Sequence, residues 1–122
     1  MTDPAPASLR LRLLFGDHLV FGPGKAELLA QIAATGSISA AGRSMGMSYK
    51  RAWSLVEEMN AAFANPLVIS ARGGPGGGGA HLSASGEEVL AAYRNIVRLT
   101  KEATAPDVAR IAALLGDRFG GK

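Results

Sequence analysis

The stretch from Gly36 to Asn60 constrains the fold most, because its pattern is that of two helices joined by a tight turn. Ser37 is placed to cap the first helix, since its hydroxyl can accept a hydrogen bond from an unpaired amide of the first turn. Gly46 supplies the backbone freedom that a sharp turn between helices requires. Ser48 is then placed to cap the second helix. The spacing therefore predicts a short helix, a turn and a longer helix.

The second helix is predicted to have one buried stripe and a basic, exposed beginning. Its apolar residues recur at helical spacing on one face: Ala52, Leu55, Val56, Met59 and Phe63. Lys50 and Ser54 fall on the opposite side, and Trp53 lies at a flank. This arrangement is typical of a helix-turn-helix, whose second helix enters the major groove of DNA by its N-terminal residues. The alternative is an ordinary helical hairpin with a solvated basic end.

Length and composition narrow the class of protein. The 122 residues suit one domain, and the excess of Lys and Arg over Asp and Glu, 13 against 10, gives a formal net charge of +3. This mildly basic balance is compatible with nucleic-acid binding but does not establish it.

The absence of cysteine excludes disulfides, thiolate metal sites and cysteine nucleophiles. No apolar run approaches the roughly 18 residues of a membrane span, and the N-terminus lacks a secretory signal. We therefore expect a cytoplasmic protein without a membrane partner.

The segment before the helix-turn-helix predicts a β-hairpin and one helix. Residues 1–8 are expected to be a disordered leader. Residues 9–13 alternate as a half-buried strand does, and residues 19–21 can return as a second strand. Residues 26–35 are expected to be a helix, and Pro23 suits the first positions of the helix that follows the hairpin. The residues of this helix that we expect to face inward are Leu28, Leu29, Ile32 and Ala33.

A glycine-rich hairpin is predicted directly after the second helix, which is expected to end near Ala64. Residues 67–72 predict a strand, residues 73–79 carry the glycine run, and residues 80–82 can return antiparallel. A hairpin at this place is the wing of a winged helix-turn-helix. Glycine allows the tip to approach a sugar-phosphate surface closely. Arg72 and His81 flank the tip and are expected to contact phosphates.

Two helices are predicted at the C-terminal end. The first runs from Ser83, its expected cap, to about residue 104, although Ser85 with Glu88 also fits a capping box. Its apolar stripe is Val89, Leu90, Tyr93, Ile96, Val97 and Thr100. Pro106 is expected to start a last helix, whose apolar face is Val108, Ile111, Ala112, Leu115 and Phe119. We expect these apolar faces to be buried against the same helices of a second subunit. The alternative is that the two helices fold back on the chain's own sheet.

Several separate segments resemble one known family. They are Phe21-Gly-Pro-Gly-Lys-Ala-Glu-Leu-Leu29, Gly36-Ser-Ile-Ser-Ala-Ala41, Met45-Gly-Met-Ser-Tyr-Lys-Arg-Ala-Trp53, Pro66-Leu-Val68 and Gly79-Ala-His-Leu-Ser. In this order and spacing they are similar to the N-terminal domain of ModE-type molybdenum-responsive transcriptional regulators, which is related to the LysR-type DNA-binding domain. The similarity covers about residues 9–100. The expected fold class is therefore α+β, mainly helical: a winged helix-turn-helix with an N-terminal β-hairpin, a glycine-tipped wing and C-terminal dimerisation helices.

The resemblance also implies a function. It implies a bacterial homodimer that binds double-stranded DNA at an operator near molybdate-transport or molybdoenzyme genes, reading it with the helix that starts at Ser48. Residues 9–104 would be the DNA-binding domain, including the long dimerisation helix, and residues 105–122 a C-terminal helix and tail. Full-length members carry further domains that bind molybdate or tungstate, and 122 residues leave no room for them, so no cofactor is expected. Gly42 replaces a more usual alanine, which should weaken its helix by roughly 0.5–1 kcal/mol.

The residues expected to contact DNA lie on the helix-turn-helix and the wing. They are Ser37, Ser48, Tyr49, Lys50, Arg51, Ser54, Arg72, Gly76, Gly77 and His81. Lys50 and Arg51 are each suited to phosphate or guanine, since arginine paired with guanine is the commonest specific contact. Trp53 is expected to pack beneath the turn. No catalytic residue or metal ligand is expected, because His18 and His81 lie far apart and no serine has a plausible base.

Two other functions remain open at this point. A winged scaffold can serve as a protein-interaction module that docks a separate sensor protein. Alternatively, the chain senses an oxyanion directly, and residues 22–25 open a helix whose free amides suit an anion, although a simple turn explains them better. The glycine run matches a G-x-G-x-x-G dinucleotide motif, which we reject because no βαβ unit surrounds it.

Overall fold

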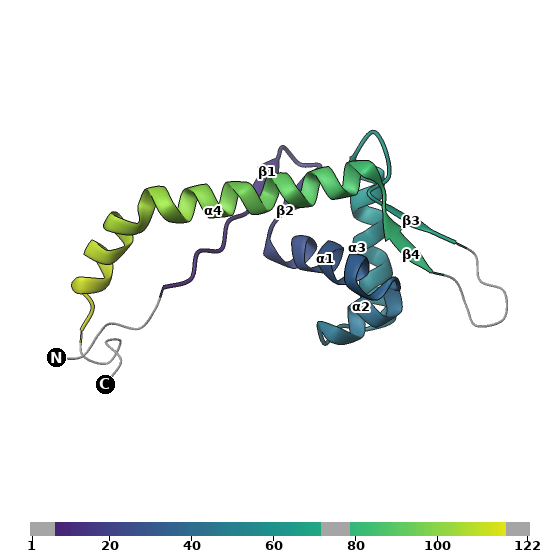
Figure 1. Ribbon diagram of the computed structural model, residues 1–122, viewed down its shortest axis with the longest axis horizontal. Helices are drawn as coiled ribbons and strands as arrows, with labels where there is room; N and C mark the ends of the chain where they lie inside the picture. Colours follow the sequence, from purple (N-terminus) through teal and green to yellow (C-terminus); the bar gives the residue numbers. More distant parts are fainter. Residues whose placement is uncertain (1–6, 72–78, 117–122) are drawn as a thin grey trace. The chain divides into compact units, whose positions relative to one another are not determined.

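The computed structural model describes residues 7–71 and 79–116, and its helices and strands follow the predicted order (Figure 1). The elements are β1 (Leu13–Phe15), β2 (Leu19–Phe21), α1 (Pro23–Thr35), α2 (Ile38–Ser44), α3 (Tyr49–Ala62), β3 (Val68–Ser70), β4 (Ala80–Leu82) and α4 (Ala84–Ala113). The predicted fold class, a mainly helical winged helix-turn-helix, is confirmed. Most of the predicted leader and the residues after 116 lie outside the described residues.

The chain divides into two compact units, which we describe separately. The larger unit is Leu11–Tyr93 and contains the two hairpins, α1 to α3 and the beginning of α4. Its largest fully buried side chains are Phe21, Leu28, Leu29, Ile32, Val56, Met59 and Leu67. These residues come from β2, α1, α3 and the start of the wing, so one core joins the helix-turn-helix to both hairpins.

The inward face of α1 differs from the predicted one at two positions. Leu28, Leu29 and Ile32 are buried as expected, but Ala33 is exposed, and Ala26 is buried. Ala33 lies near the end of α1, where the packing of the other elements leaves it uncovered. Gly36 ends the helix in the left-handed conformation, at φ 71°, as an αL cap requires.

The predicted strand at residues 9–13 is wrong, because β1 covers Leu13–Phe15 instead. The turn contains Gly16 at φ 57°, and the pairing that it sets places Leu13 opposite Phe21 and Phe15 opposite Leu19. The chain enters α1 directly after Phe21, so β2 offers no partner for residues 9–12. The Leu11 carbonyl instead accepts a hydrogen bond of 2.6 Å from the hydroxyl of Tyr93.

The predicted break between two C-terminal helices is also wrong, since α4 runs without interruption from Ala84 to Ala113 and contains Pro106. Proline lacks an amide hydrogen and usually breaks a helix interior. Alanines at 103, 105 and 109 surround it, and the high helix propensity of alanine favours helix on both sides. Ser83, rather than Ser85, caps the helix, because its hydroxyl accepts a bond of 3.0 Å from the Gly86 amide.

The apolar stripe predicted for α4 is buried only near its beginning. Leu90 and Tyr93 are buried within the larger unit, whereas Val89, Val97 and Thr100 are half-buried. In the second unit several large apolar side chains of the helix and the residues after it are exposed: Ile96, Leu99, Ile111, Leu114 and Leu115. Phe119 lies outside the described residues. Within the described ranges, no helix has the length and apolar character that crossing a membrane would require.

Candidate nucleic-acid interface

Helices α2 and α3 approach each other so closely at Gly42 that a side chain there would collide. A Cβ atom built on Gly42 would lie 2.9 Å from the Cβ of Ala52 and 3.4 Å from the Cγ of Met47. Gly42 and Ala52 are both buried. Gly42 is expected to weaken its helix, and the lack of a side chain at this position also permits the close packing of α2 on α3.

The turn between α2 and α3 depends on a second glycine. Gly46 has φ 72°, a conformation that other residues adopt only with strain. The carbonyl of Gly42 accepts hydrogen bonds from the amides of Met45, at 3.1 Å, and Met47, at 2.9 Å. The predicted role of Gly46 is thus confirmed, and the turn directs the chain into α3.

Both predicted caps are present. The hydroxyl oxygen of Ser37 accepts a bond of 3.0 Å from the Ala40 amide, and that of Ser48 accepts one of 3.0 Å from the Arg51 amide. Serine at a cap satisfies one of the unpaired amides of the first turn. A hydroxyl that accepts in this way retains its hydrogen for donation to another acceptor. Ser37 is half-buried and Ser48 is exposed.

Helix α3 separates its buried and exposed residues as predicted. Ala52, Leu55, Val56 and Met59 are buried, while Phe63 is half-buried just after the helix. The four remaining predicted contact residues of this helix are exposed: Tyr49, Lys50, Arg51 and Ser54. The buried stripe therefore anchors α3 and leaves its N-terminal turns free to meet a partner.

Trp53 is half-buried, and its ring packs against that of Tyr49. The two rings meet edge to face, with centroids 6.1 Å apart and an interplanar angle of 71°. The Trp53 Nε1 atom is buried without a hydrogen-bond partner among the described residues. Tyr49 is 58% exposed, so the Trp53 indole supports the Tyr49 ring on the surface at the beginning of α3. The prediction that Trp53 packs beneath the turn is confirmed only to the extent that the residue is half-buried with its Nε1 atom covered.

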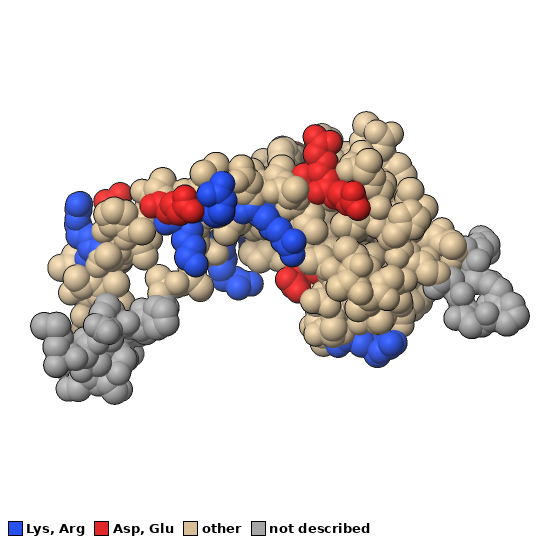
Figure 2. Space-filling view, in the orientation of Figure 1, with Lys and Arg blue, Asp and Glu red and all other residues tan. Residues whose placement is uncertain are grey.

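Positive charge gathers at the edge formed by α2 and the beginning of α3 (Figure 2). Arg43, Lys50 and Arg51 are exposed on these two helices, and neither helix has an acidic residue in its first turn. The Nη1 of Arg43 donates to the Ser39 hydroxyl at 2.8 Å, which directs this arginine along its own helix. Cations at the start of α3 oppose the helix dipole, so an anion beside them would be stabilising.

The wing is attached to the helix-turn-helix through its strands. β3 and β4 pair antiparallel, with Val68 opposite Leu82 and Ile69 opposite His81. The Ala80 amide donates to the Gly36 carbonyl at 2.8 Å, which joins β4 to the junction of α1 and α2. His81 is exposed, as a phosphate contact requires. Arg72, Gly76 and Gly77, also expected to contact DNA, lie outside the described residues.

The sequence reasoning missed the role of Asn60. Its side-chain oxygen accepts hydrogen bonds from the amides of Leu67 and Val68, at 2.9 Å and 3.1 Å, and its Nδ2 donates to the Val68 carbonyl at 3.0 Å. An asparagine beside a buried stripe, one helix turn before a loop, is a weak signal. Only the tertiary fold brings the side-chain amide of Asn60 against the beginning of β3.

The described parts of the chain contain no candidate metal centre. No group of three or more His, Cys, Asp or Glu side chains there could hold a metal ion. Lys25 belongs to the start of α1, where the free amides suit an anion. It forms an ion pair of 3.2 Å with Glu58, which favours a structural role for this segment.

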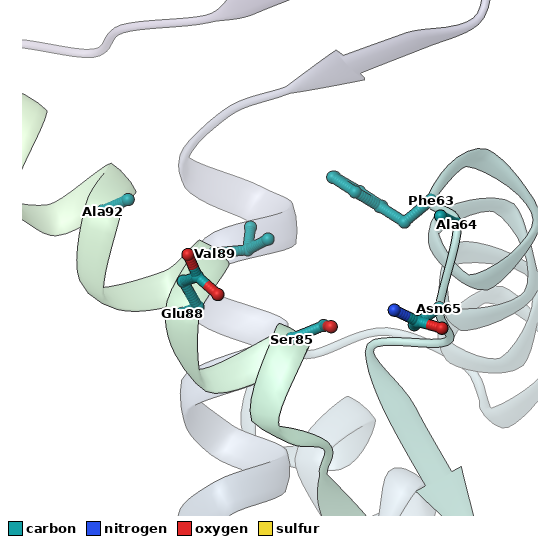
Figure 3. Close-up of a pocket in the computed structure, with 7 residues that line it drawn as sticks. All are labelled: Phe63, Ala64, Asn65, Ser85, Glu88, Val89 and Ala92. Atoms are coloured by element: carbon teal, nitrogen blue, oxygen red, sulfur yellow. The ribbon is translucent and has the colours of Figure 1, made fainter.

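A groove of about 310 Å³ lies between the end of α3 and the beginning of α4 (Figure 3). Its lining residues are Phe63, Ala64, Asn65, Ser85, Glu88, Val89 and Ala92.

Comparison with known proteins relates this arrangement to one group of bacterial proteins, although no family model matches the chain. It is 53% identical over 72 residues to the molybdenum-pterin-binding protein MopB of Rhodobacter capsulatus, covering 59% of this chain and 27% of that protein. It is 39% identical over 97 residues to the transcriptional regulator ModE of Yersinia pestis, covering 80% and 37%. The DNA-binding transcriptional dual regulator ModE of Escherichia coli K12 is 37% identical over 97 residues, with the same coverage.

Its homologues are ModE-type proteins. The predicted resemblance to ModE is thereby confirmed, while the chain spans only 27% to 37% of the length of these three relatives. Among solved structures, the chain is similar to one described as the crystal structure of a CbnR_DBD–DNA complex. The TM-score is 0.53 at 22% identity, and the match covers 74% of this chain and 95% of that one. This match supports the winged helix-turn-helix fold of the ModE-like chain.

Proposed function

We propose that this chain is the DNA-binding part of a ModE-type transcriptional regulator and that it binds double-stranded DNA sequence-specifically. The observation that carries the proposal is the serine-capped, exposed and basic beginning of α3, whose opposite face is buried. A helix anchored in this way can enter the major groove with its N-terminal residues leading. The names of the ModE relatives support the same function.

The exposed residues of α3 divide into two roles. Arg51 pairs with guanine O6 and N7, because a guanidinium can donate two parallel hydrogen bonds to that edge. Lys50 binds phosphate as a compact point charge. Tyr49, Ser48 and Ser54 donate hydroxyl hydrogens to phosphates or base edges.

The remaining contacts position the protein on the backbone of the duplex. Ser37, at the start of α2, and His81, on the wing, bind phosphates, together with Arg72 and the glycines 76 and 77. Contacts of this kind set the register of the protein on DNA without reading its sequence.

The functional unit is a homodimer that pairs through the exposed apolar residues of α4. Leu99 and Ile111 are 49% and 65% exposed, and burial against a second copy would remove this surface from water. A symmetric dimer presents two α3 helices to successive major grooves, about 34–36 Å apart. Its operator is therefore a palindrome.

The regulated genes serve molybdate transport or molybdoenzymes, as the molybdenum-related names of the relatives suggest. The protein acts as a regulator and not as an enzyme, in the cytoplasm, where bacterial DNA is accessible. DNA binding by this chain alone needs no cofactor.

Selection of bound sequences from a pool of random duplexes tests the proposal. The purified chain should enrich a palindromic motif with two half-sites about one helical turn apart. Lys50→Ala/Arg51→Ala protein of unchanged circular dichroism is the matched control and should enrich no motif. Enrichment of no sequence by the unsubstituted chain, at low as well as moderate salt, would contradict the proposal and favour a protein-interaction module.

A further inference from the structure

The first strand of the wing is held at the end of α3 by one side chain. Both ends of the Asn60 amide are used: the oxygen accepts from the amides of Leu67 and Val68, and the nitrogen donates to the Val68 carbonyl. Three bonds from one half-buried side chain fix both the distance and the orientation of β3. Asn60 therefore acts as a bridge between the helix and the wing.

Leu67, which Asn60 contacts, is also held by α4. The carbonyl of Leu67 accepts a hydrogen bond of 2.9 Å from the Ser83 amide, and the Ser83 hydroxyl donates to the Pro66 carbonyl at 2.6 Å. A Cβ atom on Gly86 would overlap the Leu67 carbonyl oxygen, so the first turn of α4 lies directly against this backbone. The beginning of β3 is thus pinned from two sides, by α3 and by α4.

We propose that Asn60 is a positioning residue that makes the recognition helix and the wing bind DNA as one rigid unit. Asn60 lies near the end of α3, nine residues after Arg51, so it acts on DNA through β3. The proposal rests on the proposed function, since it concerns how the DNA contacts are arranged. Holding the wing in place before binding reduces the ordering cost that each phosphate contact must overcome.

The variants that test this are Asn60→Asp and Asn60→Ala. Aspartate keeps an oxygen for the amides of Leu67 and Val68 but cannot donate to the Val68 carbonyl. Alanine removes all three bonds. If alanine prevents folding, the aspartate variant still tests the proposal, because it is similar in size and keeps two of the bonds. Asn65→Ala is the matched control, since Asn65 is an exposed asparagine in the same connection between α3 and β3.

The measurement is the affinity for the selected operator over a range of salt concentrations, with circular dichroism to confirm folding. Each lost phosphate contact makes the salt dependence less steep by about 0.9 units. We expect Asn60→Asp and Asn60→Ala to bind more weakly, with a slope reduced by about one to two such contacts. The specificity of both variants, measured as affinity for the operator relative to a base-substituted operator, should change little, because α3 supplies the base contacts. Asn65→Ala should match the unsubstituted chain.

The possible outcomes separate this proposal from the proposed function. Weaker binding with an unchanged salt slope would show that Asn60 only stabilises the fold, and unchanged binding would show that the bridge does not matter; either result overturns the inference while DNA binding stands. Failure of the unsubstituted chain to bind any duplex would overturn the proposed function and the inference together. Amide hydrogen exchange adds a readout without DNA: Leu67 and Val68 should exchange faster in Asn60→Ala, which loses the acceptor of both amides, while the buried part of α3 should not.

Discussion

At position 42 the lack of a side chain decides how closely α2 and α3 can approach. The closest atom to a Cβ there belongs to Ala52, another small residue, at 2.9 Å. Two of the smallest residues therefore face each other where the helix-turn-helix is tightest. On the exposed side of the same end of α3, the chemistry of single residues matters in a different way, because Lys50 and Arg51 differ in how they can bind an anion.

Gly42→Ala should destabilise the protein even though alanine favours helix. The gain in helix propensity is roughly 0.5–1 kcal/mol, whereas overpacking a buried contact usually costs about 1–3 kcal/mol. We expect the free energy of unfolding, measured in urea, to fall by about 1 kcal/mol. Gly24→Ala is the matched control in α1, because a Cβ there meets no atom within 4 Å; it should be neutral or stabilising. A stable Gly42→Ala protein would show that the helices can separate at little cost.

Arg51→Ala and Lys50→Ala should affect DNA binding differently. Removing a guanidinium that pairs with guanine should cost about 1–3 kcal/mol on the operator and relax specificity at one position. Removing a lysine that meets phosphate should weaken binding to all sequences alike and reduce the salt slope by about one unit. Competition titrations with operator and base-substituted duplexes measure both effects. If Arg51→Ala lost the same affinity for every duplex, Arg51 would contact the DNA phosphates, as Lys50 does.

At the scale of elements, hydrophobic periodicity and capping residues were sufficient to locate the helices. The caps at Ser37, Ser48 and Ser83 and the buried stripe of α3 were all predicted, because each depends on residues within one or two turns. One error concerned the strand pairing of the N-terminal hairpin, and the other overestimated proline as a helix breaker. β1 begins at Leu13 because β2 is short, and α4 continues through Pro106.

Pro106→Ala should stabilise α4. Proline in a helix interior removes one backbone hydrogen bond and crowds the preceding turn, at a typical cost of about 3 kcal/mol relative to alanine. Residue 106 is exposed, so alanine should lose little packing. We expect higher helicity by circular dichroism and slower amide exchange between residues 100 and 110. Unchanged exchange would indicate that the helix already accommodates proline without loss. Ala105→Pro, next to it, is the reverse control and should lower helicity.

At the scale of the whole molecule, the exposed apolar residues of α4 are the feature that a single chain leaves unexplained. Leu99 and Ile111 are 49% and 65% exposed, and Leu115, two residues after the helix, is 47% exposed. Large apolar side chains gathered on one helix usually mark a contact with another protein surface. In the proposed dimer they would meet the same residues of a second copy, so the oligomeric state and DNA affinity should change together.

Leu99→Asp should therefore weaken self-association. A charge buried in an apolar contact without a partner is strongly unfavourable, and analytical ultracentrifugation should show a shift from dimer to monomer. Affinity for a two-half-site operator should fall, while affinity for a single half-site should not. Lys101→Asp places the same residue on the opposite side of the helix and is the control. An unsubstituted chain that sediments as a monomer at every concentration would contradict the proposed dimer.

The sequence by itself determined the order of the elements, the three serine caps, the glycine turn at Gly46 and the basic exposed beginning of α3. These features follow from patterns within a few residues of one another. Tertiary structure alone decided which residue faces Gly42 across the contact between α2 and α3, which residues pair in the N-terminal hairpin, and what Asn60 binds. The Tyr93 hydroxyl, bonded to the carbonyl of a residue 82 positions earlier, is the extreme case. Contacts between residues far apart in the chain depend on how complete elements pack, and no local pattern encodes that packing.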